Sequence, residues 1–271
     1  MQIGGDVIRV SAGGSVGMVA AGGDVRSVRA GSISGPVTAG GNIGAPPSPE
    51  NGYVSSGLHA HLAVSATVSA AGNVERVEGR TVDAEVSAGG YVYQVAGHRS
   101  VSGSISAGTV VYNVSSQWGD IEATIVAGQS VGRVPEPGES SCSGYSDGGY
   151  SDGGYCDGGG SYADARSGAG VHAGGSISAN IDAGTYLTEV IASGPVDVTV
   201  AAGTYVGTIR TRGDLSATVE AGDQVRWISG RDAVVSVSAG ADVGSIQASR
   251  SLVVSVDTPA NLNGIWASGE V

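Results

Sequence analysis

The chain has 271 residues, of which 48 are glycine and none is phenylalanine, so its apolar side chains are mainly Val, Ile and Ala. All 13 basic residues are arginine, and 25 Asp and Glu give a net charge of −12. This acidity argues against nucleic acid and anionic membranes as partners, because both require basic patches. No apolar run approaches the roughly 20 residues of a membrane span, no signal peptide is visible before the first repeat, and glycine does not recur every third residue as in collagen.

A repeat of 18 to 20 residues organises the chain. It is clear as GGDVRSVRAGSISGPVTAG at 22–40, and the same frame fits 90–108, 185–203, 204–222 and 241–259. Each unit has a pair of apolar residues three apart, such as Leu187 and Val190, then a corner, then an alternating segment that ends in Ala-Gly. Alternation with a period of two places one set of side chains inside and the other outside. A repeat of this length predicts parallel strands that stack turn upon turn.

Aligning the alternating segments places one residue type in each column. The column of small side chains includes Ala66, Ala84 and Ala217, and the glycine after the final Ala is expected to turn the chain at positive φ. The outward columns are mostly Ser and Thr, and no two carboxylates fall directly above one another, which avoids like-charge repulsion across strands. The central inward column is entirely β-branched: Val37, Val68, Val86, Ile105, Ile125, Ile181, Val200, Val219, Val237 and Val256.

These columns predict an all-β protein, a single domain over 1–271 that forms a right-handed parallel β-helix, or β-solenoid, of about 11 turns. Neither end carries an amphipathic helix that would cover the strand edge. We therefore expect end-to-end self-association, or pairing with flanking repeats of a longer chain.

Two insertions interrupt the frame, at 45–61 and 135–174, and both are expected at the corner between the short and long segments, projecting from one side. The second is a Gly-, Ser-, Tyr- and Asp-rich segment typical of a flexible loop. Its two cysteines, Cys142 and Cys156, are either a disulfide or free thiols. Its Ser/Cys-Asp-Gly-Gly units do not match the calcium-binding nonapeptide, so weak Ca²⁺ binding is the most they indicate, and no other cofactor is expected.

The histidines and tyrosines supply the other candidate sites. His59, His61, His98 and His172 fall near one corner, as a metal or pH-sensitive cluster would, although two-turn spacing and the lack of other ligands favour exposed loop residues. Two pairs of tyrosines on adjacent turns form either sugar-stacking platforms or ladders that stabilise the rod. These pairs are Tyr93 with Tyr112 and Tyr186 with Tyr205.

The opening, GGDVIRVSAGGSVGMVAAGGDVRSVRAGSISGPVTAGGNIG, resembles the Gly-Gly-Asp-Val/Ala-Gly-Gly arrays of very large bacterial surface proteins and, more loosely, the repeats of filamentous-haemagglutinin-type adhesins. The resemblance implies an extracellular or cell-surface rod that presents loops or adheres, and surface glycans are candidate partners. No constellation of residues in the sequence forms a recognisable catalytic site, so no enzymatic activity is expected. It specifies the solenoid better than the function, because unrelated solenoids converge on such repeats.

Three alternatives remain open. A polysaccharide-active or carbohydrate-binding β-helix would need converging carboxylates, whereas Asp83 and Glu85 are the only same-turn acidic pair on the long segments. An ice-binding solenoid would need a regular uncharged Ser/Thr array. A cytoplasmic, bactofilin-like filament would also have uncapped ends.

Overall fold

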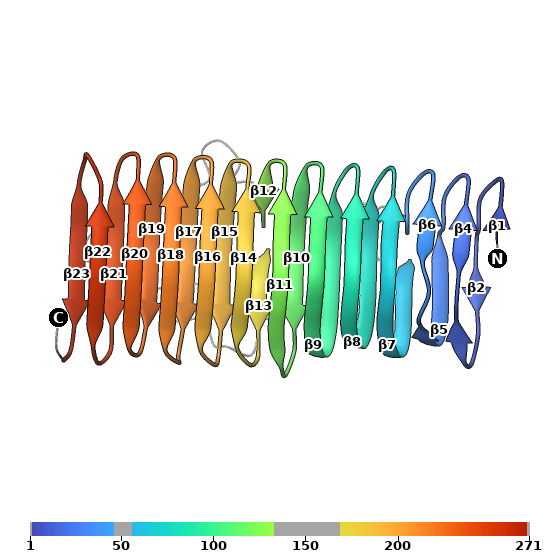
Figure 1. Ribbon diagram of the computed structural model, residues 1–271, viewed down its shortest axis with the longest axis horizontal. Helices are drawn as coiled ribbons and strands as arrows, with labels where there is room; N and C mark the ends of the chain where they lie inside the picture. Colours follow the sequence, from blue (N-terminus) through green and yellow to red (C-terminus); the bar gives the residue numbers. More distant parts are fainter. Residues whose placement is uncertain (1, 46–55, 133–168, 270–271) are drawn as a thin grey trace, which may run out of the picture.

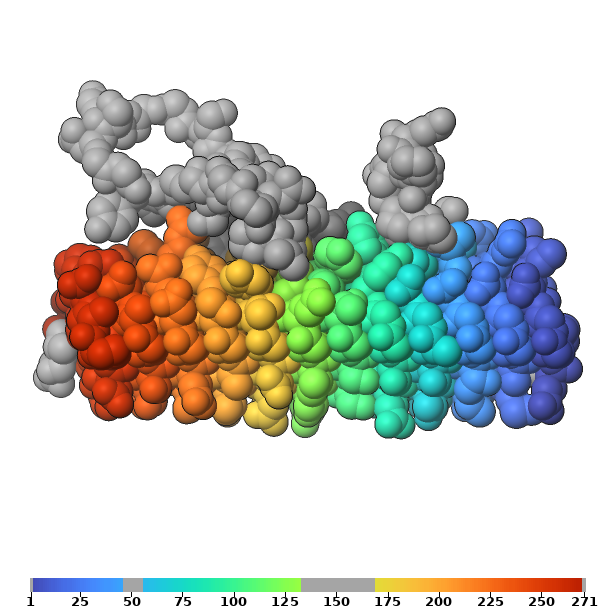
Figure 2. All heavy atoms as spheres, turned by 90° about the horizontal axis from the view of Figure 1, so that it is seen from above, coloured from blue at the N-terminus to red at the C-terminus, as the bar shows by residue number. Residues whose placement is uncertain are grey.

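The computed structural model of the protein describes residues 2–45, 56–132 and 169–269, and within them every regular element is a β-strand. All strand pairings are parallel, and each turn of the coil pairs with the turns before and after it (Figure 1). In Figure 1 the nearer strands run upward and the farther strands downward while the chain advances from right to left, so the coil is right-handed. The space-filling view shows chain order following the long axis of a rod (Figure 2).

Each turn contributes to two faces of one continuous sheet. The long face comprises the strands in register with β14 (Ile177–Ala183), and the insertion face comprises those in register with β15 (Tyr186–Ala192). The other strands of the long face are β1 (Gln2–Ile3), β3 (Ser15–Val16), β4 (Val19–Ala21), β6 (Val37–Ala39), β11 (Asp120–Ala127), β16 (Val196–Ala202), β18 (Leu215–Ala221), β20 (Ala233–Ala239) and β22 (Leu252–Asp257). The other strands of the insertion face are β2 (Val10–Ser11), β10 (Val110–Ser116), β12 (Ser130–Val131), β13 (Gly170–Ala173), β17 (Tyr205–Thr211), β19 (Gln224–Gly230), β21 (Val243–Ala248) and β23 (Leu262–Ala267). Four strands turn the corner between the two faces: β5 (Ser27–Ile33), β7 (Gly57–Ala70), β8 (Val74–Ala88) and β9 (Val92–Ala107).

The register predicted from the sequence is confirmed on the long face. Val68 pairs with Val86, Val86 with Ile105 and Ile105 with Ile125, and the column continues to Val256. Its members are buried except at the last turn, where Val256 is half-buried. The outward carboxylates also avoid one another, since Asp83 stacks on a serine, as do Glu122 and Asp197.

The coil has about twelve turns, one more than the sequence predicts. The additional turn is β23, whose Leu262 continues the inward column of the insertion face. Leu262 and Ile265 keep the apolar pair three apart, but no alternating segment follows them in the sequence, so the repeat pattern does not mark this turn. At one strand spacing of about 4.8 Å per turn, the rod is roughly 55 Å long.

The expectation that the Ala-Gly glycines turn the chain at positive φ is wrong. Among the described residues, positive φ is confined to Gly44, Gly57, Gly103, Gly132 and Gly170, and none of these follows a terminal Ala. The Ala-Gly column needs glycine for a different reason: a Cβ would run into the carbonyl oxygen of the corner residue one turn earlier. Ala71 and, in the last turn, Pro259 are the exceptions within the stack. The members where this contact occurs are Gly22, Gly40, Gly89, Gly108, Gly128, Gly184, Gly203, Gly222 and Gly240.

The predicted position of the two insertions is also wrong, because neither lies at the corner between the short and long segments. Ile43 still pairs with Val25, and Gly57 already pairs with Ser27, so the first interruption lies inside the insertion face. The expected boundaries 45–61 and 135–174 therefore extended too far, since 57–61 belongs to β7 and 170–173 is β13. The alternation rule fails here because the insertion face carries two successive outward residues between its inward columns.

Candidate functional site

Both insertions leave and rejoin the rod at the same position of a turn. Gly44 and Gly132 occupy one column of the insertion face, and Gly57 and Gly170 occupy the next. All four have positive φ, at 98°, 96°, 126° and 145° respectively, a conformation that favours glycine. In an uninterrupted turn the two positions are consecutive residues, as in Tyr112–Asn113. The shared geometry gives both insertions the same exit and entry on one side of the rod.

The two insertion points are four turns apart, with three uninterrupted turns between them. In the exit column, Glu75, Tyr93 and Tyr112 lie between Gly44 and Gly132. We call the outward residues of these three turns the inter-insertion strip: Glu75, Arg76, Tyr91, Tyr93, Gln94, Tyr112 and Asn113.

Three tyrosines and a carboxylate meet in this strip. The rings of Tyr91 and Tyr112 are edge-to-face with centroids 5.9 Å apart, and those of Tyr93 and Tyr112 are 5.5 Å apart. The Tyr91 hydroxyl donates a 2.6 Å hydrogen bond to Glu75 Oε1. The predicted pair of Tyr93 and Tyr112 is thus found in contact, and it is part of a larger cluster.

Glu75 is the most unusual residue of the cluster. It is 1% exposed, and among the described residues its Oε2 atom has no hydrogen-bond partner. Burial raises the pKa of its carboxyl, although the Tyr91 hydrogen bond opposes the shift. The pKa of Tyr91 is also raised, first by burial and then by the carboxylate beside it. A carboxyl with an unused acceptor beside aromatic rings can accept hydrogen bonds from a hydroxyl or an amine.

A second charged group lies next to the strip. Glu78 Oε2 is 2.6 Å from Arg76 Nη2 and 3.1 Å from His59 Nδ1. The His59 ring also contacts the His61 ring, with centroids 5.4 Å apart. The structure therefore brings two of the four predicted histidines together, and Glu78 is a partner of His59.

The other two histidines lie elsewhere. His98 Nδ1 is 2.8 Å from Gln117 Oε1 at an exposed corner. His172, only 3% exposed, lies in the His59 column four turns further on, and its Nε2 is 2.9 Å from Glu189 Oε1. In the described part of the chain, no three His, Cys, Asp or Glu side chains gather as metal ligands would.

Of the remaining predicted sites, only one falls within the described residues. Tyr186 and Tyr205 lie side by side on adjacent turns, with tilted rings whose centroids are 6.5 Å apart. Cys142 and Cys156, with the Asp-Gly-Gly units that could bind Ca²⁺, lie outside the described residues.

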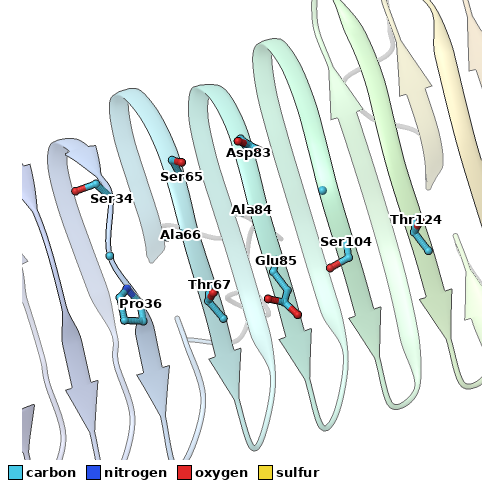
Figure 3. Close-up of a pocket in the computed structure, with 12 residues that line it drawn as sticks. Ser34, Pro36, Ser65, Ala66, Thr67, Asp83, Ala84, Glu85, Ser104 and Thr124 are labelled. Atoms are coloured by element: carbon cyan, nitrogen blue, oxygen red, sulfur yellow. The ribbon is translucent and has the colours of Figure 1, made fainter.

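The long face offers a different surface, a shallow polar hollow (Figure 3). Hydroxyl and carboxylate side chains from successive strands line it, among them Thr67, Asp83, Glu85 and Thr124. A second hollow continues it towards Asp197. Serines separate the carboxylates along the column of Asp83, Glu122 and Asp197, whereas Asp83 and Glu85 lie two residues apart on the same strand of the hollow.

Sequence reasoning missed Glu75, Tyr91 and the glycines that flank the insertions. The signals were present: Tyr91 is two residues before Tyr93, and Glu75 is one repeat before Tyr93 in the same column. A repeat pattern with two successive outward residues between the inward columns places Glu75, Tyr93 and Tyr112 in one column.

Comparisons with protein-family models, with curated proteins and with solved structures give no match to this chain. The described residues also include no helix long and apolar enough to cross a membrane.

Proposed function

We propose that this protein is a structural rod that presents its two insertions from one side, for adhesion at a bacterial cell surface. The observation that carries the proposal is the shared exit geometry of Gly44 and Gly132, four turns apart on one face. Insertions that project from one side of a solenoid commonly form its binding side.

The rod is suited to this role because it fixes the separation of the two insertions. Each intervening turn adds one strand spacing, so the insertion points lie roughly 19 Å apart. Backbone hydrogen bonds hold every turn in between, and the inward Val and Ile side chains are buried throughout this stretch. Two linked binding elements at a fixed distance can gain avidity that neither has alone.

The resemblance to surface-protein arrays supports an extracellular setting, and the net charge of −12 favours solubility. High net charge keeps an extended rod soluble. The role is structural in this proposal, and the outward carboxylates of the long face serve solubility and not catalysis.

Glycan binding at the inter-insertion strip is a second candidate. Tyr91, Tyr93 and Tyr112 are half-buried and present aromatic surface between the two insertion points. Sugars bind through aromatic contacts to their C–H faces and hydrogen bonds to their hydroxyls, and the rings and hydroxyls of Tyr93 and Tyr112 can supply both.

The test compares the whole chain with a variant that lacks both insertions, made by joining Gly44 to Gly57 and Gly132 to Gly170. Both proteins are applied to a glycan array and to immobilised cell surfaces, with circular dichroism to verify the fold. We expect the variant to keep the β-rich spectrum and to lose binding. Equal binding by both proteins would overturn the display role.

A Tyr112→Ala variant of the whole chain separates the two candidates. If the strip itself binds glycans, this variant loses array signals while the insertions stay intact. If the insertions alone bind, Tyr112→Ala binds as the parent does and only removal of the insertions matters.

A further inference from the structure

The first turn contains glycines that nothing in the described chain requires. A Cβ at Gly22 would meet the backbone of Gly4, which lies one turn earlier in the same column. A Cβ at Gly4 itself would meet no atom within 4 Å, and the same holds for Gly5. Gly23 is the counterpart of Gly5 in the next turn, and a Cβ added at Gly23 would meet the side chain of Asp6. The first turn therefore has glycine at the positions where, elsewhere in the rod, the preceding turn leaves no room for a Cβ.

A ladder of Asp and Asn side chains points to the same conclusion. Near both ends of the rod, the residue just before the first inward residue of a turn is Asp or Asn, and its side-chain oxygen accepts a hydrogen bond from the backbone N–H of the next turn. Asp6 Oδ1 accepts from Asp24 N at 2.9 Å, and Asp24 Oδ1 accepts from Asn42 N at 2.7 Å. In the first turn, the backbone N–H of Asp6 would donate in the same way to a side-chain oxygen of a preceding turn.

The last turn supplies the matching half. Asn261 lies in the same column as Asp6, because each directly precedes the inward residue of its turn, Leu262 or Val7. Asn261 N donates to Asp242 Oδ1 at 3.1 Å, and Asn261 Nδ2 donates to the same oxygen at 3.0 Å. Asn42 has the same Nδ2 bond to the preceding turn and uses its Oδ1 to accept from the next turn, so Asn261 Oδ1 is the corresponding acceptor for a thirteenth turn. In the middle of the rod this column holds other residue types, such as Tyr205 and Gln224.

The apolar core is incompletely covered at both ends. All the partly buried hydrophobic residues packed against the core belong to the first or last turns, except Ala66. Leu262, which continues a buried inward column, is 40% exposed. The partly buried hydrophobic residues of the end turns are Ile3, Val10, Ala12, Val254, Val256, Ile265 and Ala267.

We propose that copies of this chain stack head to tail, with the first turn of one copy continuing the last turn of another. Repeating the observed pattern by one turn gives the contacts. Asn261 Oδ1 of one copy accepts the backbone N–H of Asp6 in the next, as Asp6 Oδ1 does for Asp24. Gly4 lies over Pro259 and donates its N–H to the Thr258 carbonyl, as Gly22 donates to Ile3.

The charges at this junction are compatible. In the stack, Gln2 lies over Asp257 and Asp6 over Asn261, so no two like charges are directly opposed. Joining two identical ends would place the strands antiparallel and break every column. The contact is therefore heterologous, and because it does not close on itself it propagates into an unbranched rod. This assembly does not depend on what the insertions bind.

The first experiment measures association by sedimentation velocity over a wide range of protein concentration. Gly4→Val is expected to leave the monomer fold unchanged, since its Cβ meets nothing within 4 Å, and to weaken association about tenfold or more by overpacking the junction. Gln2→Val is the matched control, because its outward column already accommodates Val126. It should associate as the parent does. A parent that stays monomeric at high concentration, or a Gly4→Val variant that associates as the parent does, would overturn the proposal.

A mixing experiment tests the polarity of the contact. Asn261→Leu removes the acceptor from the last turn, and Gly4→Val blocks the first turn, so each variant alone should associate more weakly than the parent and stay monomeric at a concentration at which the parent begins to associate. Mixed together, they retain one intact end each and should form dimers and nothing longer. Circular dichroism of both variants verifies that they fold. Long oligomers in the mixture, or no dimers, would show that the ends do not pair in this way.

Discussion

The backbone N–H of Asn73 donates a 2.8 Å hydrogen bond to Asn42 Oδ1, although the first insertion separates the two residues in the sequence. Asp120 and Ser176 make the corresponding contact across the second insertion: Asp120 Oδ1 accepts from both Ser176 N and Ser176 Oγ at 2.7 Å. These bonds to Ser176 lower the pKa of the Asp120 carboxyl. Side-chain rungs thus join the turns on either side of each interruption.

Removing one rung should destabilise the rod. Asn42→Ala leaves the part-buried N–H of Asn73 without its acceptor, and we expect a loss of about 1 kcal/mol in the free energy of unfolding. Asn180→Ala is the control, because Asn180 is exposed in an outward column of the long face; it should change stability by less than about 0.5 kcal/mol. Urea titration of both variants measures the difference, and equal costs would show that the rung contributes nothing.

The glycine column gives a prediction with a contrast inside one protein. Gly203→Val places side-chain atoms against the carbonyl of Gly184, so we expect a loss of about 1–3 kcal/mol or more. Gly4→Val occupies the same column but meets nothing within its own chain, and its monomer should unfold as the parent does. Thermal melts at low protein concentration compare the two. Similar midpoints for both variants would refute the close-approach explanation.

The sequence predicted the long face well and the insertion face poorly, for a physical reason. On the long face inward and outward residues alternate strictly, so a column such as Val68, Val86 and Ile105 can be aligned by period alone. On the insertion face two successive residues point outward between Val25 and Val28, which breaks the period. The insertion points lie in that break, and so they were assigned to the wrong place.

The candidate site was predicted only in part for the same reason. Tyr93 and Tyr112 were found because they share a residue type at one repeat spacing. Glu75 shares their column but not their chemistry, and its burial depends on packing that the repeat does not encode. The role of the corner glycines was likewise misjudged, because a close carbonyl one turn away is a three-dimensional contact.

The inside and outside of the long face can be tested directly. Ala217 is 3% exposed, and Ala217→Phe should overpack the interior at a cost of roughly 1–3 kcal/mol or more. Its neighbour Thr218 is exposed, and Thr218→Ala should cost less than about 0.5 kcal/mol. Denaturant midpoints in the reverse order would contradict the observed register.

The insertions should be dispensable for folding. Joining Gly132 directly to Gly170 restores the connectivity of an uninterrupted turn, in which these positions are consecutive. Because β12 and β13 keep their partners in β10 and β15, we expect the thermal midpoint to stay within about 4 °C of the parent. Joining Gly44 to Gly57 is the parallel experiment on the first insertion. Loss of cooperative unfolding in either variant would show that the insertion is part of the fold.

The buried carboxyl of Glu75 should make stability depend on pH in a defined direction. Because its pKa is raised in the folded state, the native protein holds this proton more tightly than the unfolded chain does. Its contribution to stability is therefore fully present below the ordinary value of 4.5 and is lost as pH rises through the raised pKa. Glu75→Gln removes this titration while its amide oxygen can still accept from Tyr91. Relative to the parent, we expect the variant to gain stability as pH rises from 4.5 towards neutrality. Paired urea titrations at several pH values measure this difference, and the comparison cancels the titration of the other carboxylates. A difference that stayed constant with pH, or that moved in the parent's favour as pH rose, would show that Glu75 is not held protonated by its burial.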